Sequence, residues 1–272
     1  MKLPLFCPKC NTNVVLYGDN ACCRCCFYEY ILSNGVLVSQ RHTPNSEEST
    51  VRNRQAKGYL QHSKFPTQLA NFKRWLDMLP APQNGEIALD LGCGPGPYTA
   101  LLFDKGYSVI AIDFSLESLL INRESCLGNN KNQAVFIEED LNKLTLQKQS
   151  CSVAVMADFL QHLGSRENRQ RLLHEVFSAL NYNGKFYLSI FNINIKNYLK
   201  GDFHGGFAGG KIKYERLSPT NLVRFFPENI KVERIFPMNI VHGARLDNIL
   251  SKIPMAMFAA RMAVIQGFRK QA

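Results

Sequence analysis

One stretch, Glu86-Ile-Ala-Leu-Asp90-Leu-Gly92-Cys-Gly94-Pro-Gly96, constrains the fold more than any other part of the chain. A short apolar run of strand length leads into a glycine-rich turn, and apolar residues then recur at helical spacing from Tyr98 to Phe103. This pattern predicts a strand, a tight turn and a helix. Glycines in such a turn let the backbone approach a bound molecule, and the helix start offers unpaired N–H groups. The turn is therefore a candidate site for a nucleotide-like ligand.

The spacing of the glycines separates two classes of cofactor. A dinucleotide-binding turn has the pattern G-x-G-x-x-G, whereas this turn has G-x-G-x-G, with Pro97 where the third glycine of that fingerprint would fall. The segment from Asp90 to Gly96 resembles the first motif of the class I S-adenosylmethionine-dependent methyltransferases. The resemblance implies that Asp90 helps to orient the amino acid end of the cofactor. It also implies that the turn lies against the cofactor, through Gly92, Cys93, Gly94 and Gly96. A plain tight turn is the alternative interpretation.

Two further apolar runs lead to carboxylates. Val109 to Asp113 reads as a buried strand, and Asp113 follows Gly92 by 21 positions, an offset from which a carboxylate can accept hydrogen bonds from both ribose hydroxyls. A helix N-cap is the alternative role for Asp113, and we favour the ribose. A third strand is expected from residue 134, with an acid just past its end. In the methyltransferase family the acid that matches Asp140 binds the adenine amino group. The residues that follow the two acids are assigned to the same site, namely Phe114 and Leu141.

The fourth expected strand covers residues 152–158. In related enzymes the position of Asp158, at its end, faces the methionine end of the cofactor. His162 follows near the acceptor side of the family, and its pKa range suits a general base. His162 is the candidate catalytic residue, with a wall or hydrogen-bonding role as the alternative. The motif Asn/Asp-Pro-Pro-Tyr is absent after this strand, which argues against methylation of exocyclic amines, and Cys151 lies at the wrong end of the strand for covalent C5 chemistry.

The N-terminal segment is rich in cysteine. Cys7-Pro-Lys-Cys10 and Cys22-Cys-Arg-Cys-Cys26 have the paired C-x2-C spacing that presents four thiolates to Zn²⁺. Disulfides and free thiols are the alternatives. The second pair is either Cys22 with Cys25 or Cys23 with Cys26. The segment after Cys26 resembles the tail of zinc ribbons that are fused to methyltransferases, which favours the set Cys7, Cys10, Cys23 and Cys26. Such a site is structural, because four thiolates leave no open coordination position.

These elements predict an α/β protein with a small N-terminal zinc ribbon. The ribbon is expected over residues 1–38, a polar linker over 39–54 and the methyltransferase domain over 55–272, with acceptor-side insertions at about 192–213 and 237–260. Strands and helices alternate from residue 86, which indicates a parallel sheet covered on both faces. The family resemblance implies a Rossmann-like, seven-stranded sheet whose final strand is antiparallel.

The composition favours a globular chain in the cytoplasm. Of its 272 residues 46% are hydrophobic, which supports a sizeable core. No apolar run reaches the length of about 18 residues that a membrane span needs, and the N-terminus lacks a signal core. The sequence leaves the oligomeric state open.

The net charge of +10 is unevenly distributed. Residues 1–80 carry 10 Lys/Arg against 5 Asp/Glu, residues 81–184 carry 8 against 12, and residues 185–272 carry 14 against 5. The segments expected to border the acceptor pocket are thus basic, which favours RNA as a partner over the alternative of ordinary solvated lysines.

The order of a ribbon and a methyltransferase domain, with the segment Gly58 to Phe65 between them, also resembles the rRNA large-subunit guanine-N1 methyltransferases. An RNA guanine is therefore the lead acceptor, with a role in rRNA processing. A small quinone-like or phenol-like molecule, favoured by the apolar stretch 246–262, and a non-catalytic module that only binds S-adenosylmethionine are the alternatives.

Overall fold

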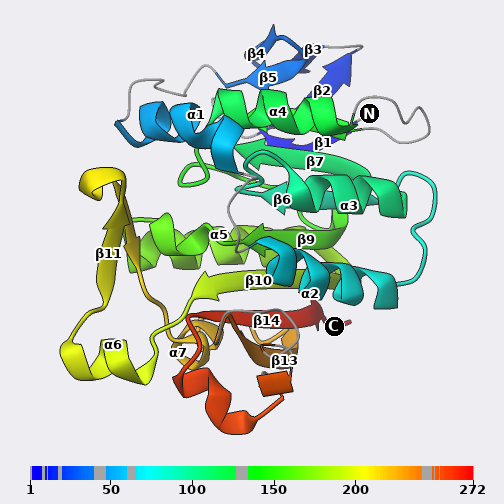
Figure 1. Ribbon diagram of the computed structural model, residues 1–272. Helices are drawn as coiled ribbons and strands as arrows, with labels where there is room; N and C mark the ends of the chain where they lie inside the picture. Colours follow the sequence, from blue (N-terminus) through cyan, green and yellow to red (C-terminus); the bar gives the residue numbers. More distant parts are fainter. Residues whose placement is uncertain are drawn as a thin grey trace.

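The computed structural model of the chain describes residues 2–7, 10, 12–17, 20–39, 47–59, 65–126, 134–240, 247, 249–250 and 252–271. Seven neighbouring strands form the larger part of its sheet: β6 (Ile87–Leu91), β7 (Ser108–Asp113), β8 (Ala134–Glu138), β9 (Cys151–Ala157), β10 (Leu180–Phe191), β13 (Ile230–Met238) and β14 (Met262–Arg269). They follow the order β8-β7-β6-β9-β10-β14-β13, and only β14 is antiparallel to its neighbours (Figure 1). The predicted Rossmann-like sheet of seven strands with an antiparallel final strand is confirmed.

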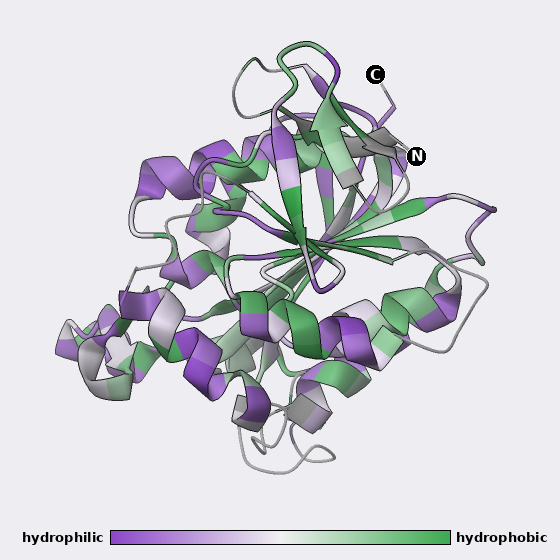
Figure 2. Cartoon of the chain, turned by 90° about the horizontal axis from the view of Figure 1, so that it is seen from above, coloured by the Kyte–Doolittle hydropathy of each residue, from purple (hydrophilic) through white to green (hydrophobic). Residues whose placement is uncertain are grey.

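Helices cover both faces of this sheet. Adjacent residues of β10 show the division: the ring of Tyr187 lies 5.1 Å from that of Phe72, while the ring of Phe186 lies 5.0 Å from that of Phe177. The first face carries α2 (Phe65–Met78), α3 (Pro97–Lys105) and α4 (Leu116–Cys126), and the second carries α5 (Arg166–Ala179) and α7 (Pro219–Val223). Figure 2 shows the strands between the helices coloured mostly hydrophobic, which is why the core lies on both sides of the sheet.

The ribbon continues the same sheet. Its strands are β1 (Lys2–Phe6), β2 (Asn13–Tyr17), β3 (Asn20–Cys23), β4 (Glu29–Ser33) and β5 (Val36–Val38), and β5 pairs in parallel with β8. A further bridge joins Leu5 to Leu146. Buried ribbon residues such as Val14 and Leu37 belong to the hydrophobic core on the α5 side. The sheet of the described residues therefore has twelve strands, and the ribbon and the α/β unit share one core.

Helix α1 (Glu47–Tyr59) corrects the linker that was expected over residues 39–54. Its sequence is mostly polar, and its few apolar residues form no stripe that would indicate a helix. Glu47 and Glu48 in its first turn and Lys57 in its last turn suit the helix dipole. The helix packs against α4, where the Ser115 hydroxyl donates to Asn53 Oδ1 at 2.6 Å. Residues 40–46 lie outside the described residues.

The acceptor-side insertion expected at about 192–213 contains regular secondary structure. It contains α6 (Ile195–Lys200), η2 (Ala208–Gly210) and a hairpin of β11 (His204–Phe207) and β12 (Ile212–Glu215). The hairpin, in yellow in Figure 1, stands at the edge of the sheet where the parallel strands end. Glycine permits this structure because Gly209 and Gly210, in the connecting turn, have φ values of 69° and 87°.

The second insertion includes most of the apolar stretch 246–262. Residues 247, 249 and 250 are helical and Pro254–Phe258 form the 3-10 helix η3, whereas residues 246, 248 and 251 lie outside the described part. A search of the described segments finds no helix long and apolar enough to cross a membrane.

Candidate cofactor and acceptor site

The glycine turn between β6 and α3 has a conformation that only glycine adopts readily. Gly92, Gly94 and Gly96 have φ values of 63°, 52° and 91°, all in the left-handed region. A Cβ atom at Gly92 would lie 2.5 Å from the ring of Phe159, and one at Gly96 would overlap the side-chain amide of Asn122. No atom of the described part of the chain lies within 4 Å of a Cβ placed at Gly94, so among the three glycines of the turn a ligand can approach the backbone here.

Asp113, at the end of β7, holds this turn. Its Oδ2 accepts a hydrogen bond from the Gly94 N–H at 2.9 Å, and its Oδ1 accepts one from the Ser115 N–H at 2.9 Å. Ser115 itself caps α4, because its hydroxyl accepts from the Ser118 N–H at 3.3 Å. The N-cap role considered for Asp113 thus belongs to Ser115. Burial raises the pKa of Asp113, while the two N–H donors partly offset that effect.

A cavity of about 320 Å³ lies over the ends of β6, β7, β8 and β9. The structure brings eight of the predicted site residues into its wall: Gly92, Gly94, Asp113, Phe114, Asp140, Leu141, Asp158 and His162. They come from four strand ends that are far apart in the sequence, as expected for a parallel sheet whose ligand binds at the carboxyl edge.

Three predicted residues lie behind the turn and outside this wall, namely Asp90, Cys93 and Gly96. Asp90 is buried, and its Oδ2 accepts a hydrogen bond from the Thr99 hydroxyl at 2.6 Å. Its Oδ1 is buried without a hydrogen-bond partner among the described residues, and burial raises the pKa of this carboxyl to about 7. Cys93 is also buried, which raises the pKa of its thiol. These residues support the turn from its protein side.

The sequence did not reveal the part of the wall that α1 contributes. Glu48, Arg52, Gln55 and Ala56 line the cavity, and Arg52 Nη2 lies 3.4 Å from Glu48 Oε1. These residues occur in a helix without apolar periodicity, so no sequence signal marked them. Other lining residues that were not predicted follow the strand ends: Pro95, Ser115, Ser118, Asn142, Lys143, Ala157, Phe159 and Leu163.

Asp158 is oriented by side chains from two distant elements. The Ser189 hydroxyl, on β10, donates to its Oδ1, and Gln68 Nε2, on α2, donates to its Oδ2 at 2.9 Å. Burial raises the pKa of Asp158 to about 6, against the opposing effect of these two donors. Its φ of 59° is left-handed, which places the carboxylate at the bend where the chain leaves β9.

His162, in η1 (Leu160–His162), has a defined tautomer. Its Nδ1 lies 2.8 Å from the carbonyl oxygen of Lys213, which only accepts, so Nδ1 carries the hydrogen and Nε2 keeps its lone pair. Burial, followed by the positive charge of Arg52, lowers the pKa of His162 to about 4. The imidazole is therefore neutral at neutral pH and can accept a proton at Nε2.

Four thiols converge in the ribbon. One sulfur atom each from Cys7, Cys10, Cys23 and Cys26 lies within 4.8 Å of the others, with 3.5 Å between Cys7 and Cys26 and 3.3 Å between Cys10 and Cys23. A hydrogen bond from the Thr12 hydroxyl is the main cause that lowers the pKa of Cys10 to about 6. Four close thiols, one with thiolate character, fit the tetrahedral sulfur set of a zinc site. Cys22 and Cys25 are outside this group.

The domain at the centre of the chain matches a known family. Residues 89–188 match the family model described as "Methyltransferase domain". This segment runs from β6 to β10 and includes the glycine turn, Asp113, Asp140, Asp158 and His162.

Two curated proteins are similar to part of the chain. A stretch of 118 residues is 28% identical to the "Putative methyltransferase YqeM" of Bacillus subtilis (strain 168). This alignment covers 42% of this chain and 47% of that protein. A stretch of 149 residues is 27% identical to the "Ubiquinone biosynthesis O-methyltransferase" of Idiomarina loihiensis. This alignment covers 52% of this chain and 59% of that protein. The chain thus spans about half the length of the curated relatives it matches.

Solved structures show the same fold. The crystal structure of the N-methyltransferase NodS from Bradyrhizobium japonicum WM9, in complex with S-adenosyl-L-homocysteine, matches with a TM-score of 0.59. The match covers 83% of this chain and 100% of that chain at 9% sequence identity. The chain therefore has the class I methyltransferase fold.

Proposed function

We propose that this chain, in which residues 89–188 match the methyltransferase family model, transfers the methyl group of S-adenosylmethionine to a ring nitrogen or an oxygen of RNA, with a guanine as the lead acceptor. One observation carries the donor part of the proposal. The open backbone at Gly94, the carboxylates of Asp113 and Asp140 and the side chain of His162 line a single cavity at the carboxyl edge of the sheet.

The cavity offers each part of the cofactor a partner. Asp113, held by the Gly94 N–H, suits the ribose hydroxyls, since both of its oxygens retain accepting capacity. Asp140 suits the adenine amino group, and its Oδ1 is oriented by the Asn142 N–H at 2.9 Å. Asp158 suits the cationic amino group of the methionine end. NodS, which has the same fold, holds S-adenosyl-L-homocysteine in its crystal structure.

The chemistry requires little more than positioning. S-adenosylmethionine supplies its own leaving group, because the sulfonium becomes a neutral thioether when the methyl group departs in line with the incoming lone pair. The protein has to align donor and acceptor and to accept the acceptor's proton. Nε2 of His162 is neutral and carries the lone pair for that step. A pKa of about 4 leaves His162 unprotonated at neutral pH but makes it a weak base, so it suits an acceptor whose proton becomes acidic as the methyl group arrives.

Charge favours a polyanionic acceptor. Residues 81–184, which hold most of the cofactor wall, have an excess of acids, whereas residues 185–272 carry 14 Lys/Arg against 5 Asp/Glu. The basic third of the chain contributes the hairpin that contacts His162 through Lys213. A basic surface beside the acceptor side of the cavity attracts the phosphates of RNA.

Transfer of label from radioactive S-adenosylmethionine into a total cell extract tests the proposal. The extract is separated into RNA, protein and organic-soluble fractions after reaction with the wild type and with Asp113→Ala. We expect nuclease-sensitive label in the RNA fraction with the wild type alone. Label confined to another fraction would refute RNA as the acceptor, and binding of the cofactor without label in any fraction would favour the non-catalytic module.

A small quinone-like or phenol-like acceptor is the second candidate. One relative is named as a ubiquinone biosynthesis O-methyltransferase, and the insertion around η3 exposes Ile249, Ile253, Met255 and Phe258. Exposed apolar side chains beside the sheet edge suit an apolar substrate. This candidate predicts that the label enters the organic-soluble fraction.

A further inference from the structure

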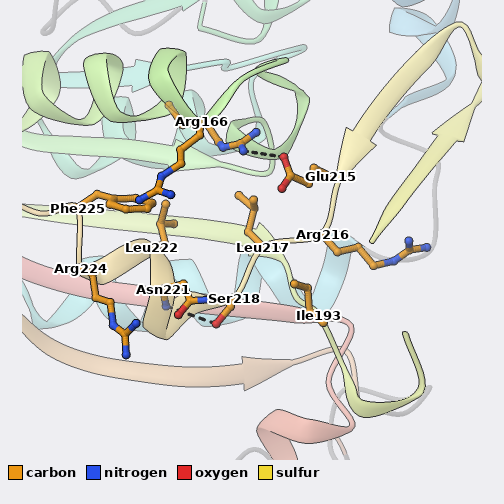
Figure 3. A pocket seen from close by; sticks show the side chains of 11 residues that line it. Arg166, Ile193, Glu215, Arg216, Leu217, Ser218, Asn221, Leu222, Arg224 and Phe225 are labelled. Carbon is orange, nitrogen blue, oxygen red and sulfur yellow. Dashed lines mark hydrogen bonds and ion pairs between the residues drawn. The ribbon is translucent and has the colours of Figure 1, made fainter. Parts of the chain in front are cut away.

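A second cavity, of about 370 Å³, lies beside the cofactor cavity and is not used by the proposed methyl transfer. It is enclosed by the start of α5, the segment from β12 to α7, and α7 with the residues that follow it (Figure 3). Its lining contains four arginines and one acid: Arg166, Arg169, Arg216, Arg224 and Glu215. The excess of positive charge indicates an anionic ligand.

Two of the four arginines are committed to the protein itself. Arg169 is buried, donates to Glu215 Oε2 at 2.6 Å and donates to the Leu163 carbonyl oxygen at 2.8 Å. Arg216 donates to Asp202 Oδ1 at 2.8 Å and to the His204 carbonyl oxygen at 2.8 Å. These contacts fix the wall of the cavity and neutralise its acid.

Arg166 and Arg224 remain available for a ligand. Both are exposed, and neither forms a salt bridge with a carboxylate of the described residues. The Arg166 guanidinium lies 4.3 Å from the centroid of the Phe225 ring, which holds its plane over the aromatic face. Figure 3 shows this stacked pair on one side of the cavity, with Arg224 near the same end.

The rest of the lining suits a planar group. Ile193, Leu217 and Leu222 form an apolar part of the wall, and Ser218 and Asn221 add polar side chains. An unstacked nucleobase needs this combination, an apolar surface for its faces and hydrogen-bonding groups for its edge. Arginines beside such a surface are in place to bind the adjoining phosphate.

The two cavities share a wall. Leu163 lines the cofactor cavity, and its carbonyl oxygen accepts the hydrogen bond from Arg169 of the second cavity. On the other side, the Tyr214 ring lies 6.2 Å from the His162 ring, and Glu215 follows Tyr214 in β12. The acceptor side of the cofactor cavity and the second cavity are therefore bordered by the same segments, η1 with Leu163 and strand β12.

We infer that the second cavity takes up one nucleotide of the RNA acceptor strand, adjacent to the methylated one, with its base against Leu217 and Leu222 and its phosphate at Arg166 and Arg224. This inference rests on the proposed function. It assigns a strand-binding subsite to residues that lie outside the cofactor cavity.

Two double variants of equal charge test the inference. Arg166→Gln with Arg224→Gln alters the cavity, whereas Lys231→Gln with Lys270→Gln removes two exposed lysines near the opposite end of the sheet, by the start of β13 and the end of β14. Binding of a fluorescent, single-stranded RNA of mixed sequence is measured over a series of salt concentrations. We expect the cavity variant to bind roughly tenfold more weakly and to lower the salt slope by about 0.7, the value for the one phosphate that the two arginines share on a single strand. The control variant should bind within about twofold of the wild type.

Affinity for S-adenosyl-L-homocysteine shows that each variant is folded, and we expect it to be unchanged. Equal losses in the two variants would overturn the subsite and leave the RNA proposal intact, because net charge alone would then explain binding. Unaltered RNA binding in the cavity variant would likewise overturn the subsite and leave the RNA proposal intact. A wild-type chain that labels no RNA and binds none would overturn the proposed function together with this inference.

Discussion

The carboxylate of Asp113 and the backbone of Gly94 are joined by a hydrogen bond of 2.9 Å, from the glycine N–H to Oδ2. This bond connects the end of β7 to the turn that follows β6, although the two residues are 19 positions apart. It orients the carboxylate before any ligand arrives, and of the three glycines of the turn it fixes the one whose Cβ would meet no atom of the described residues within 4 Å. The proposed ribose contact and the proposed backbone contact therefore depend on each other.

Asp113→Asn should weaken cofactor binding without unfolding the protein. An asparagine keeps the shape but has one accepting oxygen, so it cannot serve Gly94, Ser115 and two ribose hydroxyls together. Losing a hydrogen bond to a charged group costs about 1.5 to 3 kcal/mol, so we expect the Kd for S-adenosyl-L-homocysteine to rise roughly 10- to 100-fold in calorimetric titrations. Asp104→Asn, at an exposed position of α3, is the control. Wild-type affinity in Asp113→Asn would disprove the ribose role.

Alanine at two glycines of the turn should separate stability from binding. Gly94 and Gly96 both have positive φ, so alanine costs about 1 kcal/mol at either position, or roughly 2 to 4 °C in Tm. At Gly96 the added methyl group also overlaps Asn122, so Tm should fall further. At Gly94 the methyl group enters the cavity, so cofactor affinity should fall more than Tm. Thermal melts and cofactor titrations of both variants test this expectation. Equal falls in Tm and equal falls in cofactor affinity in the two variants would contradict it.

The strand ends around the cofactor cavity could be predicted because each depends on a short local pattern. Apolar runs locate β6, β7 and β9, and a glycine or an acid marks the end of each run. The register follows, since parallel strands bring these ends to one edge. This is why Asp113, Asp158 and Gly94 line one cavity even though the sequence separates them widely.

The parts that sequence did not reveal depend on distant contacts. Gln68 contacts Asp158, which is 90 positions away in the sequence. No local pattern of α2 indicates that this polar side chain points inward. Arg52 lies in a helix stabilised by packing on α4 rather than by an apolar stripe, so the segment has the composition of a linker. The parallel pairing of β5 with β8 likewise depends on contacts that arise only when the chain folds.

His162→Gln tests the proposed base. A glutamine amide can donate to the Lys213 carbonyl oxygen but cannot accept a proton, so the local structure is kept and the base is lost. General bases contribute about 10²- to 10⁴-fold, and we expect kcat for RNA methylation to fall within that range. Binding of S-adenosyl-L-homocysteine should remain as in the wild type. A fall in kcat of less than about tenfold would assign His162 to the wall of the site.

Single serine substitutions should identify the metal ligands of the ribbon. Cys23→Ser removes a thiol from the group of four, whereas Cys22→Ser removes its neighbour outside that group. We expect about one zinc per chain in the wild type and in Cys22→Ser, and a loss of metal in Cys23→Ser, by elemental analysis of purified protein. Since Cys7 and Cys23 are buried in the shared core, metal loss should also lower Tm. Loss of zinc from Cys22→Ser with retention in Cys23→Ser would establish the other register.

The pH dependence of cofactor binding tests Asp158. Its pKa is raised by burial from 3.8 to about 6, so the protonated carboxyl is favoured in the folded chain. The contribution of the protonated Asp158 carboxyl to the stability of the fold is therefore fully present below about pH 3.8 and is lost as the pH rises through 6. Only the ionised carboxylate attracts the ammonium group of S-adenosyl-L-homocysteine, so affinity should weaken by up to about tenfold per pH unit below pH 6.

Asp158→Asn suits the left-handed φ of 59° and should remove this dependence. Relative to the wild type, its Tm should rise between pH 4 and pH 7, because the variant buries no charge. Parallel titrations between pH 5 and pH 7.5 decide the matter, and the same pH profile in both proteins would exclude Asp158 as the cofactor's charged partner.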